Sequence, residues 1–428
     1  MVDRKNFLRN WIMKIGENSV GKSLLFGTYD PLIPDELKRE VQKQKRKRVP
    51  KRKRVKQMPK INVIAAAILL WCGSALAADV KVIREIYTEV PAQYIYEIPV
   101  EKLAVYFLKS LNDVDKKLRV GNDNDKVTLY YDGKMVKSLY KPKDANDIEA
   151  WVELSAEIMD TASKKSPTAA QQDFELADLL MAGAIKHFDK DSKFYLNPED
   201  NQGKRLKHQR NFAERKVDDN IYIKILAFNA YTKSGVEEAV KKYPEAKGLI
   251  LDLRGSPGGM LSEGVAVADL FLDDAIIAST KGRKEAEEVY FNAEDGDILN
   301  GRPIVVLIDG DTASAAEVLA AALQEQDRAK VIGTNSLGKG SIQTLVSLSD
   351  GATIALTSAY FYTPSGSRLH GHGVLPDVCT FEMPEAKNIK NLLALPRNQF
   401  CPRESRADEG LDLDAAREML ATELNLGV

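Results

Sequence analysis

Histidine is scarce in this chain, with four residues among 428. A serine or cysteine nucleophile usually takes a histidine as its base, and none of the four comes with a convincing acidic partner. His187 and His208 lie in the N-terminal half, whereas His370 and His372 are flanked by glycines in an expected turn. A Ser-His-Asp triad therefore has no support in the sequence, although residues far apart in the chain can meet in a fold.

A long apolar run is also missing. The most apolar stretch, residues 61–72, is shorter than the ~20 residues of a comfortable membrane span. It follows Lys60 and precedes Ala75-Leu76-Ala77, an A-x-A cleavage signal. Residues 58–77 thus have the order and proportions of a secretory signal peptide, and we expect the exported protein to begin at Ala78.

The signal does not stand at residue 1. We interpret Met58 as the real start and residues 1–57 as a basic extension that is a misassigned start. If the extension is translated, its charge would hold the N-terminus in the cytoplasm and leave an uncleaved anchor. Cys72 makes a poor lipidation site because Trp71 stands where a small residue is needed.

An excess of basic over acidic residues is confined to the N-terminus. Residues 1–60 hold 18 Lys/Arg and 6 Asp/Glu, leaving 43 and 56 in the remainder, although the net charge of the whole chain is −1. The mildly acidic body argues against a nucleic-acid-binding surface across it, and the basic run at 43–56 is typical of a solvated tail. Residues 16–23 match the phosphate-binding pattern G-x-x-x-x-G-K-S. Nothing around them could form the required sheet, so we interpret the match as chance; ATP binding lost on removing residues 1–57 would revive a nucleotide- or nucleic-acid-binding protein.

Residues 78–198 predict a mixed, mainly helical domain. Helices are expected over residues 79–118, 146–163 and 171–188. A β-hairpin is expected around Asp132-Gly133, a strong type I′ turn signal. His187 and Asp189 fit no standard metal-ligand spacing, so we expect a helix end with a polar loop and no metal.

From residue 221 strands alternate with helices. Each strand is a near-continuous apolar run, which is typical of an α/β domain with a mostly parallel sheet. Strands are expected in IYIKILAF, GLILDLRG, PIVVLIDG and AKVIGT, helices in TKSGVEEAVKKY, GGMLSEGVAVADLFL and SAAEVLAAALQEQ, and two more strands in GATIALTSAYFYTPSG. We expect a polar linker over 199–220, one domain over 221–380 and a C-terminal segment over 381–428.

Ser314 follows the strand that ends at Asp309 and precedes a helix. Ser314-Ala-Ala-Glu317 is a capping box, which by itself favours a structural role. Catalytic groups of α/β domains also lie on such loops, and lysine is an alternative base for a serine. Lys339 stands between two glycines after the next buried strand. Neutralising a lysine at pH 7 costs about 4.6 kcal/mol, so Lys339 can act only from an apolar pocket.

Several motifs follow one another in the order of a known family. They are LILDLRGSPGG, DTASAAEVLAAALQ, AKVIGTNSLGKGSIQT, FYTPSGS and GHGVLPD, over roughly residues 221–378. This set resembles the carboxy-terminal processing (tail-specific) peptidases, Ser/Lys proteases of bacterial periplasms and chloroplast lumens. VIREIYTEV and FDKDSKFYLNPED resemble the N-terminal helical elements of that family. The resemblance implies a crotonase/Clp-protease-like catalytic domain.

The resemblance also assigns roles to individual residues. Ser314 matches the nucleophile, Lys339 its general base, and Gln343 the glutamine that orients the lysine. With Ser314 committed to chemistry, we expect the helix cap to fall to Asp311 or Thr312. No cofactor is implied.

Two backbone N–H groups are expected to form the oxyanion hole. One is that of Ala315, at a helix N-terminus where donors and dipole favour an anion. The other is placed near Gly258, in the glycine turn.

The sequence departs from the family in one respect. Most members carry a PDZ domain between the NPED-type segment and the strand that begins at 221. Residues 199–220 are too few for an autonomous domain of ~50 residues. We therefore expect cleavage to depend little on the last residues of a substrate.

Removing Cys72 with the signal leaves Cys379 and Cys401, an even pair in an oxidising compartment. We expect them to be bridged.

These observations predict an exported serine endopeptidase that hydrolyses peptide bonds in extended protein segments, located in the periplasm or secreted. Its partners would be protein or peptide substrates and no nucleic acid, with membrane contact only through an uncleaved N-terminal segment, which would anchor it to the inner membrane. The alternative is a non-catalytic binding or scaffolding protein on the same fold. Homo-oligomerisation and an activating partner remain open.

Overall fold

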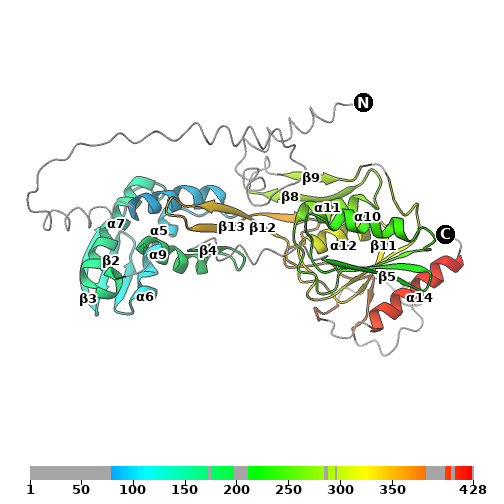
Figure 1. Cartoon of the computed structure of the whole chain (residues 1–428). Coiled ribbons are helices and arrows are strands. Elements are labelled where there is room, and N and C mark those ends of the chain that lie inside the picture. Colours follow the sequence, from blue (N-terminus) through cyan, green and yellow to red (C-terminus); the bar gives the residue numbers. More distant parts are fainter. Residues whose placement is uncertain are drawn as a thin grey trace, which may run out of the picture. The chain divides into compact units, whose positions relative to one another are not determined.

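The computed structural model describes residues 79–171, 175–196, 211–283, 288–294, 296–381, 401–405 and 410–426. The N-terminal extension, the signal segment, Cys72, the phosphate-loop match and His208 lie outside the described residues, as does the linker up to residue 210. The chain divides into two compact units (Figure 1). Of the described residues, the helical unit holds 79–171, 175–196 and 343–358, and the sheet unit holds 211–283, 288–294, 296–342, 359–381, 401–405 and 410–426.

The helical unit opens with a helix over 79–93. It continues with α5 (Val100–Lys109), α6 (Leu111–Val114), α7 (Ile148–Lys165), α8 (Pro167–Ala170), α9 (Leu176–Ala184) and the 3-10 helix η1 (Ile185–His187). Its antiparallel sheet has the order β1 (Leu118–Asn122), β2 (Lys126–Tyr131), β3 (Lys134–Tyr140). The predicted hairpin is confirmed: Asp132 and Gly133 join β2 to β3 with φ of 50° and 76°, both in the left-handed region that a type I′ turn requires.

Residues 343–358 belong to the helical unit. The sequence analysis had assigned them to the domain expected over residues 221–380. The reason is apolar burial. Leu348, Ile354 and Leu356 are at most 5 % exposed and pack in one core with Trp151 and Phe107. In the same unit β4 (Lys193–Tyr195) pairs antiparallel with the first residues of β13 (Thr353–Tyr362).

The sheet unit is built on a six-stranded sheet of order β14-β11-β10-β7-β6-β5. These strands are β5 (Phe212–Val217), β6 (Asn220–Ile225), β7 (Leu249–Asp252), β10 (Ile304–Ile308), β11 (Ala329–Gly333) and β14 (Val378–Cys379). All neighbours are parallel except β5 and β6, in agreement with the mostly parallel sheet predicted from the apolar runs.

Both faces of this sheet are covered, which explains why its strands are apolar throughout (Figure 1). Along β7, Leu249 and Leu251 face the core shared with α10 (Thr232–Lys242), α11 (Leu261–Asp269) and α12 (Ala315–Glu325). Ile250 faces the opposite core, which is shared with α14 (Gly410–Leu426).

The described residues also form strands β8, β9 and β12. β8 (Ile276–Gly282) pairs antiparallel with β9 (Val289–Asn292) and, on its other side, with the last residues of β13. β12 (Ser341–Ser347) precedes β13. None of the helices in the described part of the chain is both long enough and apolar enough to cross a membrane.

The structure corrects two further sequence predictions. Residues 212–217, expected as part of a polar linker, form strand β5, which pairs with β6 through a turn at Asp218. The stretch expected to hold two strands, GATIALTSAYFYTPSG, holds the single strand β13, because its ten residues continue without a break.

Asp178 of α9 is a buried carboxyl group in the helical unit, and its burial makes the stability of the protein depend on pH. It is 6 % exposed, and its Oδ1 has no hydrogen-bond partner among the described residues. Burial, together with the nearby acidic groups of Asp350, Glu175 and Asp79, raises the pKa of Asp178 to about 8. Because the folded-state pKa lies above the unfolded value, the stabilisation is fully present below pH ~4 and is lost as the pH rises through about 8.

We therefore expect Asp178→Asn to raise the free energy of unfolding at pH 9, by on the order of 2 kcal/mol, and to change it little at pH 4. Urea unfolding at both pH values measures this. Equal destabilisation at the two pH values would contradict the assignment.

Candidate active site

Three loops meet at one edge of the parallel sheet, because the carboxyl ends of β7, β10 and β11 lie there together. The loop after β10 carries Ser314. Its Ala313 N–H donates to the Ser256 carbonyl of the β7 loop (2.9 Å), and its Thr312 carbonyl accepts from the Leu337 N–H of the β11 loop (2.9 Å). Backbone hydrogen bonds thus join all three loops.

Ser314 stands in a strained conformation at the start of α12. Its φ of 57° and ψ of −120° fall in a backbone region that residues other than glycine rarely adopt. Such strain clusters at active sites, and a serine nucleophile is often presented on a sharp turn between a strand and a helix.

The N-cap of α12 is Ser314 itself, so the expectation that Asp311 or Thr312 caps the helix is wrong. Asp311 and Thr312 form hydrogen bonds within the loop that precedes the helix. The Asp309 carboxylate accepts the N–H groups of Asp311 and Thr312, each at 3.1 Å, and the Thr312 hydroxyl donates to the Leu253 carbonyl at 2.9 Å.

Glu317, the acidic member of the capping box, links the Ser314 and Lys339 loops. One carboxylate oxygen, Oε2, accepts both the Ser314 N–H (2.8 Å) and the Lys339 N–H (2.9 Å). The other, Oε1, accepts the Gly338 N–H (2.6 Å) and the Ser336 hydroxyl. The backbones of the serine and the lysine are therefore held by a single oxygen atom.

Glu317 is fully buried. Burial raises the pKa of its carboxyl, and the hydrogen bonds from Ser336, Gly338, Ser314 and Lys339 work in the opposite direction. Because an ionised carboxylate has about four acceptor sites and no donor, the four donors fit the ionised form. Sequence reading assigned Glu317 to the cap alone, although a glutamate within so apolar a helix was a signal of buried partners.

Lys339 lies in the β11 loop with its side chain exposed to solvent. The apolar pocket that the sequence argument requires for a neutral lysine does not surround it in this structure. Gln343 is half-buried in β12, within the part of that strand that belongs to the helical unit.

Gly258 packs directly against Ser314. Its φ is +84°, and a Cβ added there would lie 2.8 Å from the Ser314 Cβ and from the Ala315 nitrogen. Only glycine fits this approach. Among the described residues, no hydrogen-bond acceptor pairs with the N–H of Gly258 or of Ala315. Two residues next to the serine thus carry unpaired N–H groups, and that of Ala315 lies at a helix N-terminus, a favourable place for an anion.

A buried ion network fixes the start of the Gly258 loop. The Arg254 guanidinium donates to both carboxylate oxygens of Asp252 (2.9 and 2.7 Å) and to Asp412 of α14 (3.0 Å). All three side chains are at most 2 % exposed. Burial acts to raise the pKa of Asp252, but the bonds from Arg254 outweigh it, so the pKa lies below its ordinary value. Sequence reasoning missed Asp412, which lies 158 residues from its partner.

The remaining sequence candidates lie elsewhere in the described structure. His187 stacks on Tyr106 with ring centroids 4.5 Å apart. Asp189 accepts hydrogen bonds from Ser192 and Thr357, which is the expected polar loop after a helix end. His370 packs on the Tyr360 ring at 4.8 Å. Within the described ranges, no group of three or more His, Cys, Asp or Glu side chains could hold a metal ion.

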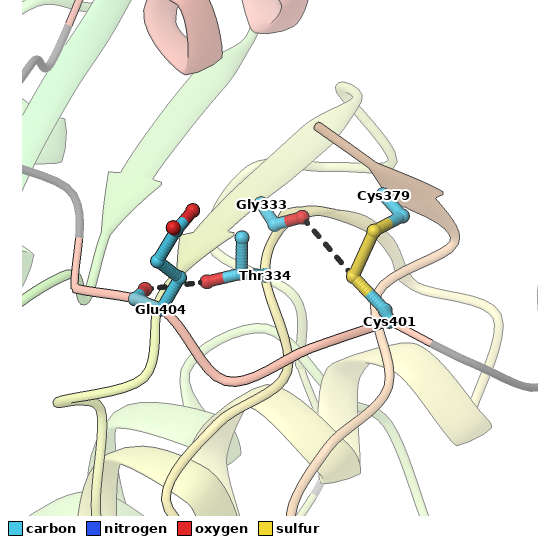
Figure 2. The surroundings of a disulfide bond; sticks show 5 residues. All are labelled: Gly333, Thr334, Cys379, Cys401 and Glu404. Carbon is cyan, nitrogen blue, oxygen red and sulfur yellow. Dashed lines mark hydrogen bonds between the residues drawn. A yellow bond between two sulfur atoms is a disulfide. The ribbon is translucent and has the colours of Figure 1, made fainter. Parts of the chain in front are cut away.

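Cys379 and Cys401 form a disulfide, with Cα atoms 5.9 Å apart (Figure 2). Cys379 stands in the edge strand β14, opposite Gly333 of β11.

Because the Glu317 carboxylate accepts four hydrogen bonds, its replacement should lower the stability of the protein. Glu317→Gln replaces one acceptor oxygen by an NH₂ group that would face N–H or O–H donors, leaving buried groups unpaired. We expect the free energy of unfolding to fall by about 1–3 kcal/mol, measured by urea denaturation. Glu325→Gln, at the exposed end of the same helix, serves as the control and should cost much less. Equal effects of the two substitutions would show that Glu317 does not hold these loops together.

Comparisons with known proteins identify the family of this domain. Residues 219–380 match the model of peptidase family S41. The carboxy-terminal-processing protease of Bartonella bacilliformis is 44 % identical over 163 residues, covering 37 % of this chain and 38 % of that protein. The carboxyl-terminal-processing protease of Synechocystis sp. is 42 % identical over 36 % of each chain.

A solved structure titled photosystem II D1 C-terminal processing protease is 32 % identical, covers 39 % of this chain and 47 % of that one, and has a TM-score of 0.36. The chain matches well under half the length of the two curated relatives named above. Over residues 219–380, this chain contains a domain of peptidase family S41, and its curated relatives are carboxy-terminal processing proteases.

Proposed function

We propose that the protein is an exported serine endopeptidase that cleaves peptide bonds in extended segments of other proteins, with Ser314 as nucleophile and Lys339 as general base. One observation carries the proposal. Ser314 is held in a strained conformation with Gly258 packed directly against it, and the N–H groups of Gly258 and Ala315 have no acceptor among the described residues. A helix cap alone needs neither the strain nor the second donor.

In the proposed reaction, neutral Lys339 takes the proton of the Ser314 hydroxyl as its oxygen attacks the scissile carbonyl. The N–H groups of Ala315 and Gly258 stabilise the oxyanion, a contribution of about 3–4 kcal/mol per donor in serine proteases. Lys339 then protonates the leaving amine, and water hydrolyses the acyl ester on Ser314. Gln343 would orient the lysine amine.

The exposed side chain of Lys339 adds a condition to this mechanism. The base must be neutral, and neutralising a lysine at pH 7 costs about 4.6 kcal/mol in water. A substrate segment lying over the lysine would exclude water from it and so provide the desolvation that the free enzyme lacks. Activity would then require a bound segment that covers the loop, as addition of an extended peptide to a strand edge can achieve.

The same exposure favours one alternative, a protein of this fold that binds extended segments without cleaving them. Both candidates take protein or peptide partners, in line with relatives named as carboxy-terminal processing proteases. The absence of a PDZ domain remains part of the proposal, since it rests on the short length of residues 199–220.

Ser314→Ala and Lys339→Ala should each reduce cleavage of an unfolded protein substrate by at least ~10³-fold while leaving the thermal midpoint within a few degrees of the parent. Each change removes a group that the reaction needs but leaves the Glu317 bonds, which are made by backbone N–H groups. Lys330→Ala, on β11 of the same unit, is the matched control and should keep full activity. Substantial cleavage by Lys339→Ala near neutral pH would exclude the dyad, and an inactive parent would favour the binding protein.

Export is tested separately. We expect protein purified from its native host to begin at Ala78, because Ala75-Leu76-Ala77 satisfies the small-residue rule for cleavage. N-terminal sequencing measures this, and a mature chain that still starts at Met58 would show an uncleaved anchor instead.

A further inference from the structure

Residues 401–405, here called the C-terminal strap, run beside the loops that carry Ser314 and Lys339. Figure 2 shows Glu404 of the strap next to Thr334, and Cys401 at its start joined to Cys379. Both loops belong to the sheet unit, as does the strap.

Main-chain carbonyls of the strap bind the two loops to each other. The Glu404 carbonyl accepts the Gly310 N–H of the Ser314 loop (2.9 Å) and the Thr334 hydroxyl of the Lys339 loop (2.7 Å). The Pro402 carbonyl accepts the Asn335 N–H of the Lys339 loop (3.0 Å). The strap therefore joins both loops through residues that Glu317 does not bind.

The approach is close enough to restrict the loops. A Cβ at Gly310 would lie 2.7 Å from the Glu404 nitrogen, and one at Gly338 would lie 3.1 Å from the Arg403 guanidinium. That guanidinium in turn donates to the carbonyls of Gly371 (2.5 Å) and His372 (3.1 Å). The glycine before Lys339 thus packs against the strap as well as binding Glu317.

The disulfide holds the strap at its first residue. Cys379 is fixed by the pairing of β14 with β11, so the bond ties Cys401 to the edge of the sheet. The strap binds the loops through main-chain carbonyls, not through side chains. These hydrogen bonds therefore depend on the position at which the strap backbone is held. The two cysteines stand 22 positions apart in the sequence, so the bond joins segments that are distant along the chain.

The disulfide is within reach of a small reductant. Cys379 is partly exposed, and Cys401 borders a cavity of about 950 Å³ that is also lined by Asn335, Arg403 and His372.

We propose that the Cys379–Cys401 disulfide is a redox switch of the peptidase: oxidised, it holds the strap against the Ser314 and Lys339 loops, and reduced, it releases them and activity falls. The activity readout rests on the proposed function.

The chemistry of opening is thiol–disulfide exchange with a dithiol reductant. One thiolate of the dithiol attacks a sulfur of the disulfide and forms a mixed disulfide while releasing the first cysteine. The second thiol then displaces the other cysteine. Two electrons and two protons pass to the protein, giving two cysteine thiols and the cyclic disulfide of the reductant.

The test compares oxidised and dithiothreitol-reduced protein in two measurements. Reduction should lower kcat at least 10-fold with a smaller change in KM, because the strap positions loops rather than substrate. Hydrogen exchange should accelerate at least 10-fold at the amides of Gly310 and Asn335 and stay unchanged at Leu251, in the centre of the sheet. Reoxidation should restore both. The variant with Cys379→Ser and Cys401→Ser should behave as the reduced protein and ignore dithiothreitol, which controls for effects of the reagent.

Unchanged rate and exchange on reduction would overturn the switch and leave the proposed function standing. Accelerated exchange throughout the sheet, Leu251 included, would also overturn it, because the bond would then support the whole unit rather than the loops. If the oxidised protein has no peptidase activity, the proposed function fails, while exchange at Gly310 and Asn335 still decides whether the bond holds the strap.

Discussion

The candidate site depends on one buried carboxylate. A charge taken out of water is tolerated only if it is fully hydrogen-bonded, and Glu317 meets this demand with four donors from two loops. The hydrogen bonds that stabilise the carboxylate also fix the backbones of Ser314 and Lys339 to one oxygen atom. Any movement of either loop would leave a buried acceptor unpaired, so the proposed chemistry of the site and the stability of the sheet unit rest on the same bonds.

The glycine turn is fixed by a second set of charges. Asp309 accepts the Gly255 N–H at 2.9 Å, and Arg254, one residue earlier, is locked between Asp252 and Asp412. Removing one partner of such a buried pair is far more damaging than replacing the whole set by apolar groups. Since Asp412 comes from α14, the last helix of the chain contributes to the position of a loop that contacts Ser314. The strap acts on the other two loops, so two C-terminal segments support the site.

Much of this fold could be predicted from the sequence, and the successes have a physical basis. β7, β10 and β11 are buried on both faces, which leaves continuous apolar runs, and Asp132-Gly133 suits the positive φ of its turn. Ser314 and Lys339 were selected as candidates through motifs at strand ends. Their common partner Glu317 was not, because a capping box accounts for it locally. β5 was read as linker since its exposed face is charged, and Asp412 could not be found from spacing, because its bond to Arg254 depends on how α14 packs on the sheet. Nor does sequence report that the Lys339 side chain is exposed.

The central claim is that Ser314 is an activated nucleophile, and it can be tested without a known substrate. A serine-reactive phosphonate carrying a short apolar peptide would be incubated with the oxidised protein, and the modified residue located by mass spectrometry. The account predicts a single adduct on Ser314 that is absent from the Lys339→Ala protein. An adduct on another serine, or equal labelling of Ser314 with and without Lys339, would contradict it.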